Sequence, residues 1–255
     1  MSEMERKEFS KQELLEMLEK IGEKLGKPVV AFMLGGGAMC FRNQKISTRD
    51  LDLVFENKNQ ALAFCGVLPE LGFGKKGRLE IEYEEMKAEG IWEEKGGFRI
   101  DVFAGKVCGA LELSEGVRER SGKLVVFGKL EVRTFSNEDV VLFKSVTDRD
   151  RDVDDIAAIV KTASLDWNGI KSEIREQTLH YPNLPTLMFN KSIDLKEKHE
   201  ISPPIVSWLK RKSNEQILRL EFKQRLEAGM TKEQALDSLA KHGFSKKEME
   251  KLLES

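Results

Sequence analysis

The chain has 255 residues, of which 40% are hydrophobic and 34% charged, and its 42 basic and 44 acidic side chains give a formal net charge of -2. Abundant apolar residues and a small net charge exclude a disordered or collagen-like chain, and the length suffices for one large or two small domains. The three cysteines, Cys40, Cys65 and Cys108, are dispersed and form no Cys-x-x-Cys pair. This spacing argues against a disulfide scaffold, a zinc site or a cysteine protease, and we expect a cytoplasmic protein.

The start of the chain carries no export signal that we can identify. Residues 1–10 mix charges of both signs and lack an apolar stretch. The longest apolar run, residues 28–41, contains three glycines and is too short to span a bilayer. We therefore expect no membrane segment, and the balanced charge predicts no general attraction to nucleic acid.

In the first half of the chain, strand patterns alternate with glycine turns. A helical spacing of leucine and isoleucine over residues 14–25 precedes an apolar run, residues 28–34, which is typical of a buried strand. Residues 50–55 give the next strand signal, and an amphipathic helix is expected near residues 59–71. Further strand patterns cover residues 78–83, 98–103 and 123–133.

From residue 137 onward the apolar spacing is helical, and Ser136 is the expected N-cap. Residues 181–204 contain four of the six prolines, so we expect an irregular connection there, with helices resuming over residues 205–228. At the end of the chain, Thr231 and Ser245 each stand three residues before a glutamine or glutamate, which predicts two capped helices in a small hairpin.

The order of these elements predicts the fold class and its divisions. Strands first and helices later favour an α+β fold with an all-α C-terminal extension over a doubly wound parallel sheet. We divide the chain into a first domain over residues 1–163, a helical extension with the proline-containing connection over residues 164–228, and a helical hairpin over residues 229–255.

The residues that suggest chemistry are carboxylates in strand patterns. Asp50 and Asp52 are two positions apart, so on a strand both point to one face while Leu51 and Leu53 point to the other. Adjacent like charges repel unless a cation intervenes, and oxygen ligands so placed suit Mg²⁺. Solvated acids at a strand end are the alternative, and for an isolated Asp-x-Asp they are the commoner outcome.

Two neighbouring features favour a site. The turn Gly35-Gly36-Gly37 follows a buried strand, so its backbone could approach a ligand and its amides could hold phosphate, although a simple tight turn is the alternative. Asp101 stands among apolar residues in a later strand pattern, where a charged side chain needs a partner such as a metal.

Together these pieces resemble the nucleotidyltransferase superfamily related to DNA polymerase β. The matching elements are Gly36-Gly37, Ser47-Thr48-Arg49-Asp50-Leu51-Asp52-Leu53 and Ile100-Asp101-Val102, within residues 28–163. The later segment VLFKSVTDRDRDVDDI is similar to one in the AbiEii-like, toxin-type transferases of abortive-infection systems. Its matching residues are Lys144, Arg149, Asp152 and Asp155.

The resemblance implies a mixed β-sheet flanked by helices and a transfer reaction that depends on Mg²⁺ or Mn²⁺. A nucleoside monophosphate would move from ATP or another NTP to a hydroxyl of an RNA or protein acceptor, with pyrophosphate leaving. Asp50 and Asp52 would hold the metals, and Asp101 would ligate the second metal and help to deprotonate the hydroxyl. The implied nucleotide-binding residues are Gly35, Gly36, Gly37, Thr48 and Lys144.

The same resemblance implies a toxin–antitoxin setting, in which an antitoxin or another protein would be a partner. The chain departs from the superfamily pattern at the turn, where many relatives have Gly-Ser instead of Gly36-Gly37, and at Lys45, where relatives often have arginine. Two alternatives therefore stay open. One is a binding module on this scaffold without turnover, and the other is a structural protein whose acids only solubilise a strand edge.

Overall fold

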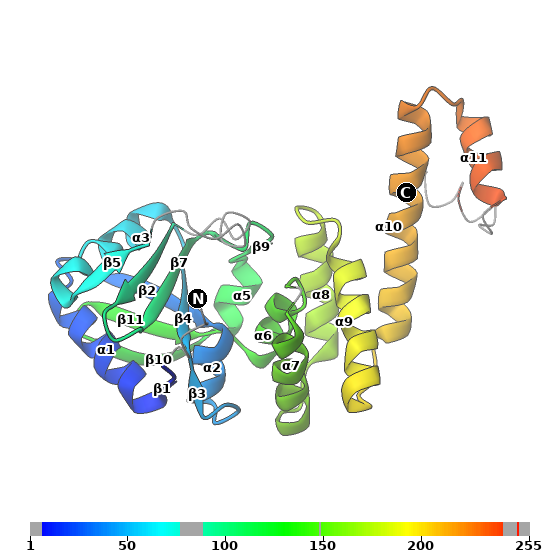
Figure 1. Ribbon diagram of the computed structural model, residues 1–255. Coiled ribbons are helices and arrows are strands. Elements are labelled where there is room, and N and C mark those ends of the chain that lie inside the picture. Colours follow the sequence, from blue (N-terminus) through cyan, green and yellow to red (C-terminus); the bar gives the residue numbers. More distant parts are fainter. Residues whose placement is uncertain (1–6, 77–88, 148, 242–248, 250–255) are drawn as a thin grey trace, which may run out of the picture. The chain divides into compact units, whose positions relative to one another are not determined.

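The computed structural model describes residues 7–76, 89–147, 149–241 and 249 (Figure 1). The chain divides into two compact units, Met1–Tyr181 and Pro182–Ser255, and we treat each by itself. The three-domain division expected from the sequence stays a prediction. The strand expected over residues 78–83 and the cap expected at Ser245 lie outside the described residues.

The first unit is built on a mixed β-sheet, as expected for an α+β fold. Among the described residues this sheet has nine strands, seven of them in the order β10-β11-β2-β4-β7-β6-β5, with β8 and β9 attached to β7. The pairs β11–β2 and β4–β7 are parallel and the others antiparallel. A separate pair joins β1 (Phe9–Ser10) to β3 (Ser47–Thr48). The sheet strands are β2 (Val29–Leu34), β4 (Asp50–Phe55), β5 (Phe73–Lys75), β6 (Gly90–Glu94), β7 (Arg99–Ala104), β8 (Lys106–Val107), β9 (Leu111–Glu112), β10 (Gly122–Phe127) and β11 (Leu130–Thr134).

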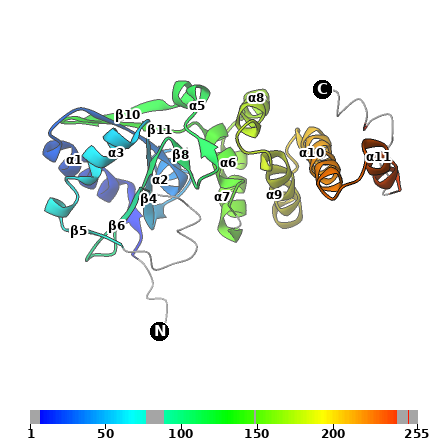
Figure 2. The ribbon, with the colours of Figure 1, turned by 90° about the horizontal axis from the view of Figure 1, so that it is seen from above.

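Helices of this unit cover the sheet and extend beyond it. They are α1 (Lys11–Lys24), α2 (Gly35–Phe41), α3 (Lys58–Cys65), the short 3-10 turn Pro69–Leu71, α5 (Glu115–Arg120), α6 (Asn137–Lys144), α7 (Asp150–Thr162) and α8 (Trp167–Thr178). Figure 2 shows α1 and α3 on one side of the unit, away from α6 and α7. Leu18 of α1 and Phe64 of α3 belong to one buried cluster with Leu53 and Val102 of the sheet.

Strand alternation decides which side chains face that core. In β4, Leu51 and Leu53 are fully buried in the cluster, so Asp50 and Asp52 emerge on the other face. In β7, Ile100 points into the same cluster, which places Asp101 beside the β4 aspartates. The face of the sheet opposite α1 and α3 therefore carries the acidic residues.

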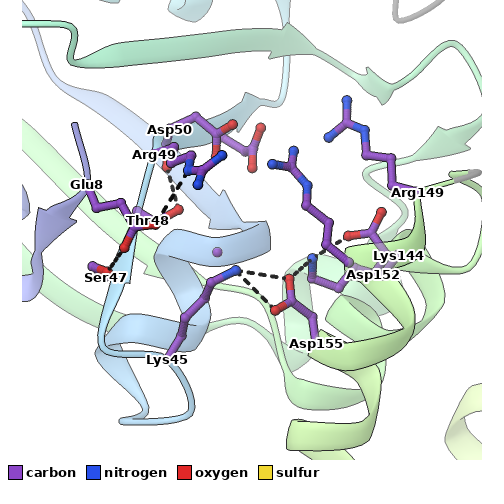
Figure 3. Close-up of a pocket in the computed structure, with 13 residues that line it drawn as sticks. Glu8, Lys45, Ser47, Thr48, Arg49, Asp50, Lys144, Arg149, Asp152 and Asp155 are labelled. Atoms are coloured by element: carbon purple, nitrogen blue, oxygen red, sulfur yellow. Dashed lines mark hydrogen bonds and ion pairs between the residues drawn. The ribbon is translucent and has the colours of Figure 1, made fainter. Parts of the chain in front are cut away.

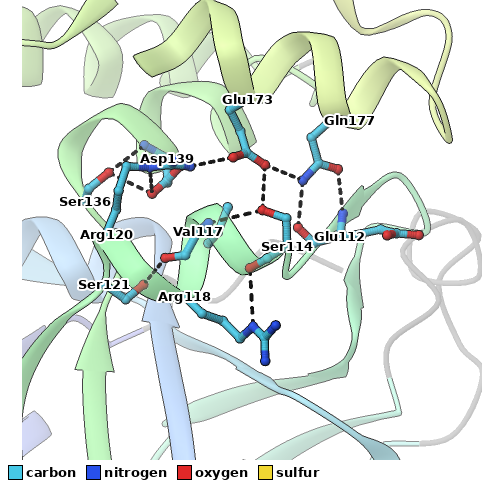
Figure 4. A network of polar contacts seen from close by, with 10 residues as sticks. All are labelled: Glu112, Ser114, Val117, Arg118, Arg120, Ser121, Ser136, Asp139, Glu173 and Gln177. Carbon is cyan, nitrogen blue, oxygen red and sulfur yellow. Dashed lines mark hydrogen bonds and ion pairs between the residues drawn. The ribbon is translucent and has the colours of Figure 1, made fainter.

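A buried polar network fixes α5, α6 and α8 around this face (Figure 4). Arg120 lies 2.7 Å from Asp139 of α6 and 2.6 Å from Glu173 of α8, measured from its Nη2 atom to the nearest carboxylate oxygens. Gln177 donates to Glu173 at 2.7 Å and exchanges two hydrogen bonds with the backbone of Glu112. Because α6 ends at Lys144, this network also sets the position of a residue in the candidate site.

Two sequence expectations in this unit are wrong in detail. Residues 123–133 form two antiparallel strands, β10 and β11, because Gly128 adopts a left-handed φ of 53° and turns the chain. The helix expected near residues 59–71 ends at Cys65 and is followed by a 3-10 turn that begins at Pro69. The expected cap of α6 by Ser136 is confirmed, because the Ser136 side chain accepts from the Asp139 N–H.

The second unit is helical in its described part. It contains α9 (Leu184–His199), α10 (Val206–Glu227) and α11 (Lys232–Ala240). The irregular connection expected over residues 181–204 is wrong, because Pro185 occupies the first turn of α9, where the missing N–H costs nothing. Thr231 caps α11 through the expected capping box with Gln234.

Within the described part of the chain, no helix combines the length and the apolar character that crossing a membrane requires.

Candidate functional site

The three aspartates expected in the site lie on one face of two neighbouring strands. In the parallel pair β4–β7, Asp52 is opposite Asp101 and Asp50 is opposite Arg99. Paired positions of adjacent strands share a face, so three carboxylates and one guanidinium are brought together. The alternation of DLDLVF was sufficient to predict the shared face of Asp50 and Asp52.

Asp101 has a basic partner that the sequence analysis did not anticipate. Arg99 donates from Nε to Asp101 Oδ1 at 2.6 Å and from Nη2 to Oδ2, so both carboxylate oxygens are engaged. Both side chains are almost fully buried, at 4% and 3% exposure. Burial raises the pKa of Asp101, and the Arg99 guanidinium opposes that shift. The partner that this buried charge requires is therefore supplied by the chain itself.

Asp52 differs from Asp101 in having no basic partner in the described part of the chain. Within the described residues its carboxylate accepts no hydrogen bond and forms no ion pair. Burial and repulsion from Asp50 and Asp101 raise the pKa of Asp52 well above its usual range, while Lys144 and Arg149 act in the other direction. A carboxylate in this position is stabilised either by a proton or by a cation placed beside it.

The three glycines begin a helix instead of forming a separate turn, since α2 starts at Gly35 itself. Gly35 has a φ of 61°, and a Cβ there would lie 2.3 Å from Asp52 Oδ2. A Cβ on Gly36 would lie 2.4 Å from the hydroxyl oxygen of Thr48. Gly37 packs closely against Met33 of β2. These glycines therefore let the site side chains approach the backbone.

Thr48 and Lys144, both expected to contact nucleotide, have protein partners in the structure. Thr48 is 3% exposed, and its hydroxyl donates to the Asp50 carbonyl at 3.1 Å. Lys144 Nζ lies 2.7 Å from Asp152 Oδ1 and 2.6 Å from Asp155 Oδ2. Burial alone would lower the pKa of Lys144, but the two carboxylates reverse this effect and raise it. The ammonium therefore joins α6 to α7 at the wall of the site.

A cavity of about 330 Å³ opens beside these residues, and we call it the charged cavity (Figure 3). Its size is within the range of small-molecule sites. Of the expected site residues, it is lined by Gly36, Thr48, Asp50, Asp52 and Lys144. Its remaining lining residues are Glu8, Lys45, Ser47, Arg49, Arg149, Arg151, Asp152 and Asp155. Gly35, Gly37 and Asp101 are not among the described residues that line it.

The basic residues of this cavity were mostly missed as site residues. Lys45 reaches Asp155 at 3.0 Å, and Arg49 lies 3.4 Å from Glu8. Lys45, Arg49 and Arg151 are interspersed among the acids of the two motifs, which is the signal that could have identified them. Their positive charge suits a polyphosphate, which carries several negative charges in a small volume.

A second, smaller opening adjoins the first, and we call it the apolar recess. It shares Asp52, Lys144, Arg149 and Asp152 with the charged cavity. Its other lining residues are Leu34, Gly35, Phe103, Val107, Cys108, Val140, Phe143 and Thr147. Asp52 therefore stands in the wall between two openings of different chemistry.

A divalent ion fits this donor set only in part. Within the described residues, no group of three or more histidine, cysteine, aspartate or glutamate side chains is arranged to hold a metal. Asp50 and Asp52 are two adjacent oxygen donors without hydrogen-bond donors of their own, which suits an ion that keeps water or phosphate oxygens as further ligands. Asp101 does not fit as a ligand while Arg99 holds both of its oxygens.

A comparison with known proteins agrees with this arrangement. No curated protein matches the chain. The chain matches the model of a family described as a nucleotidyltransferase of unknown function, DUF6036. The match covers residues 12–198, which is most of the chain and includes every residue of the site from Lys45 to Asp155. The resemblance to the nucleotidyltransferase superfamily is thereby confirmed, and the chain belongs to this family of nucleotidyltransferases.

Proposed function

We propose that the chain transfers a nucleoside monophosphate from ATP or another NTP to a hydroxyl group of an RNA or protein acceptor, with Mg²⁺ or Mn²⁺ as the cofactor. The observation that carries this proposal is the pair Asp50 and Asp52, whose carboxylates face a cavity lined by both basic and acidic side chains and lack donors within the described residues. Membership of a nucleotidyltransferase family supports the general class of reaction.

Each part of the charged cavity has a role in this proposal. Asp50 and Asp52 would hold the divalent ion, which when bound supplies positive charge to the phosphate oxygens. Lys45, Arg49 and Arg151 would bind the polyphosphate and orient its leaving pyrophosphate. The contacts of Lys144 with Asp152 and Asp155 would keep this wall rigid. Asp101 would accept a proton from the attacking hydroxyl after release from Arg99.

The biological setting follows from the AbiEii-like segment alone. The likeness of residues 141–156 to toxin-type transferases supports a toxin that acts in the cytoplasm and is held by an antitoxin or another protein partner. This setting predicts growth arrest when the chain is expressed alone. The same arrest must be absent from the Asp50→Asn variant if the toxicity is enzymatic.

Incubation with radiolabelled NTPs, Mg²⁺ or Mn²⁺ and a cell extract tests the activity. We expect the wild type to label an acceptor, and Asp50→Asn and Asp52→Asn to lose at least about 100-fold of the rate, because each removes a charge that acts in the transition state. Glu56→Gln is the matched control, since Glu56 is an exposed acid just after β4 and pairs with Arg118 outside the cavity. Equal labelling by all four proteins contradicts the proposal.

A binding module without turnover is a second candidate, and the Arg99–Asp101 pair is the observation that favours it. In this pair, Arg99 holds the carboxylate of Asp101 that would accept the proton. In addition, Gly36-Gly37 offers no hydroxyl to the phosphates. Calorimetry that shows NTP binding, together with no pyrophosphate release under any metal, would support this candidate. Measurable pyrophosphate release that depends on Asp50 rules it out.

A further inference from the structure

The apolar recess and the charged cavity lie on opposite sides of Asp52 along the strand direction. Asp50 lines only the charged cavity, and Asp52 lines both. Phe103 lines only the recess, and its partner on β4 is Val54, two residues beyond Asp52. Because β4 and β7 are parallel, the order along both strands places Asp52 between the two openings.

The two openings differ in charge. Lys45, Arg49 and Arg151 line the charged cavity alone. The residues found only in the recess are mainly apolar, among them Phe103, Val140 and Phe143. A polyphosphate gains Lys45, Arg49 and Arg151 as partners in the charged cavity, whereas the recess offers only the shared Lys144 and Arg149 beside mainly apolar walls. The two openings therefore favour different parts of a substrate.

The geometry of the proposed transfer gives the recess a role. In an in-line displacement the attacking oxygen and the leaving oxygen stand on opposite sides of the phosphorus. If the pyrophosphate lies in the charged cavity and the α-phosphate lies beside Asp50 and Asp52, the hydroxyl arrives from the opposite side of Asp52. The recess is the opening on that side.

The size of the recess limits what can enter. Its volume is about 60 Å³, against about 330 Å³ for the charged cavity. A water-sized group needs roughly 10–15 Å³ of such cavity volume, so the recess holds on the order of five non-hydrogen atoms. This number is about half of the non-hydrogen atoms of a purine base. A serine or threonine side chain fits within this volume, and its methylene or methyl group suits the apolar walls.

We propose that the apolar recess receives a serine or threonine side chain, so that the acceptor is a protein. This inference rests on the proposed function and narrows its acceptor class. In the step, the side-chain oxygen forms a bond to the α-phosphorus and the bond from that phosphorus to the bridging oxygen breaks. Pyrophosphate leaves with the bonding electron pair, and the hydroxyl proton passes to Asp101, as in the proposed function.

Cys108 offers a direct measure of what occupies the recess. It is partly exposed, whereas Cys40 and Cys65 are buried and serve as internal controls. Burial raises the pKa of Cys108 to about 12, so iodoacetamide must be applied for hours at mildly alkaline pH. With binding of MgATP and of magnesium tripolyphosphate verified by calorimetry, we expect both to leave the alkylation rate of Cys108 unchanged.

Protection of Cys108 by MgATP but not by tripolyphosphate would mean that the nucleoside fills the recess, which overturns this inference and leaves the proposed function intact. Protection by both would place the polyphosphate there and overturn it as well. If the wild type binds neither compound, the proposed function itself fails.

Alkylation of the folded protein then tests the acceptor, because the added group fills the recess after folding is complete. We expect radiolabel from ATP in an extract to enter protein and to resist ribonuclease, and alkylation to abolish this labelling without weakening ATP binding. Cys108→Ala treated with iodoacetamide must behave like the same variant untreated. Label in RNA, or labelling that survives alkylation, overturns the inference, and ATP binding with no labelled product at all overturns the transfer reaction.

Discussion

Asp52 and Asp101 occupy paired positions on parallel strands, yet only Asp101 is joined to a basic residue, Arg99, through both carboxylate oxygens. The two acids share a face of the sheet, and burial raises the pKa of both, with added repulsion from Asp50 in each case. One negative charge is therefore neutralised by the chain and the other requires a proton or an added cation. This asymmetry distinguishes the roles that the two acids can take in the proposed reaction.

Removal of Arg99 should move Asp101 into the metal-binding set. Arg99→Met leaves a buried carboxylate without its partner, so we expect the free energy of unfolding to fall by about 3–5 kcal/mol in the absence of divalent ions. Added Mg²⁺ should restore more stability to this variant than to the wild type, because Asp101 becomes able to bind the ion beside Asp50 and Asp52. Urea unfolding with and without Mg²⁺ measures both effects.

Arg133→Met is the matched control, since Arg133 is an arginine on β11 of the same sheet, separated from β7 by β2 and β4, and its pair with Glu131 is partly exposed. Its loss should change the free energy of unfolding by no more than about 1 kcal/mol and should not alter the response to Mg²⁺. An equal gain from Mg²⁺ in Arg99→Met and in the wild type would show that Asp101 does not join the metal site.

Local signals in the sequence predicted the helix caps and the acidic face well. Ser136 and Thr231 cap their helices as expected, because capping depends on residues only three positions apart. The irregular segment expected around Pro185 was wrong, since proline in the first turn of a helix is as compatible with helix as with loop. The turn at Gly128 was missed because the strand pattern continues on both sides of it.

Contacts distant in sequence could not be derived in this way. Lys45 meets Asp155 across 110 positions, and nothing local to either residue indicates the pairing. The role of Gly35 also depends on tertiary structure, because the side chain that excludes a Cβ at this first residue of α2 belongs to Asp52 on β4. The expectation that this turn holds phosphate stays a prediction, and the sequence did not indicate that the Asp52 side chain lies against Gly35.

A methyl group added at Gly35 should lower both the free energy of unfolding and the response of the protein to Mg²⁺. Gly35→Ala forces a left-handed φ of 61° on alanine and places the new Cβ 2.3 Å from Asp52 Oδ2. We expect a loss of about 1–3 kcal/mol in the free energy of unfolding from backbone strain, with a further loss of Mg²⁺ response as Asp52 moves.

Gly26→Ala is the control, because nothing lies within 4 Å of its Cβ position and a neutral or slightly stabilising effect is expected. Thermal unfolding with and without Mg²⁺ compares the two variants. Equal effects of the two substitutions would show that Gly35 is not needed for the close approach of Asp52.

The ion pairs of Asp155 should make part of the stability depend on pH. Burial acts to raise the pKa of Asp155, but Lys144 and Lys45 outweigh it and hold the pKa below the usual 3.8. A lowered carboxylate pKa contributes stability that is fully present above pH 3.8 and is lost as the pH falls through the value in the folded state. Asp155→Asn should therefore lower the free energy of unfolding by about 1.5–3 kcal/mol at neutral pH and by progressively less below pH 4.

Urea unfolding of Asp155→Asn and the wild type from pH 7 down to pH 2 measures this difference. Glu70→Gln is the control, because Glu70 is exposed and pairs with Lys24 at 3.5 Å on the surface. Its stability curve should parallel that of the wild type. A difference between Asp155→Asn and the wild type that stays constant across the acid range would mean that the pairs with Lys144 and Lys45 do not control the pKa of Asp155.

Loss of Arg120, which joins α5 to α6 and α8, should destabilise the first unit strongly. Arg120→Met leaves Asp139 and Glu173, which are 1% and 2% exposed, without their common cation. We expect a loss of about 3–5 kcal/mol in the free energy of unfolding, because two buried carboxylates then repel each other and keep only the neutral donors Ser136, Ser114 and Gln177. Arg118→Met, two residues away, removes an exposed pair with Glu56 and a long hydrogen bond of 3.4 Å to the Ser114 carbonyl, and should cost less than about 1 kcal/mol. Chemical unfolding followed by circular dichroism compares the two, and a similar small cost for both would show that the network does not hold these helices together.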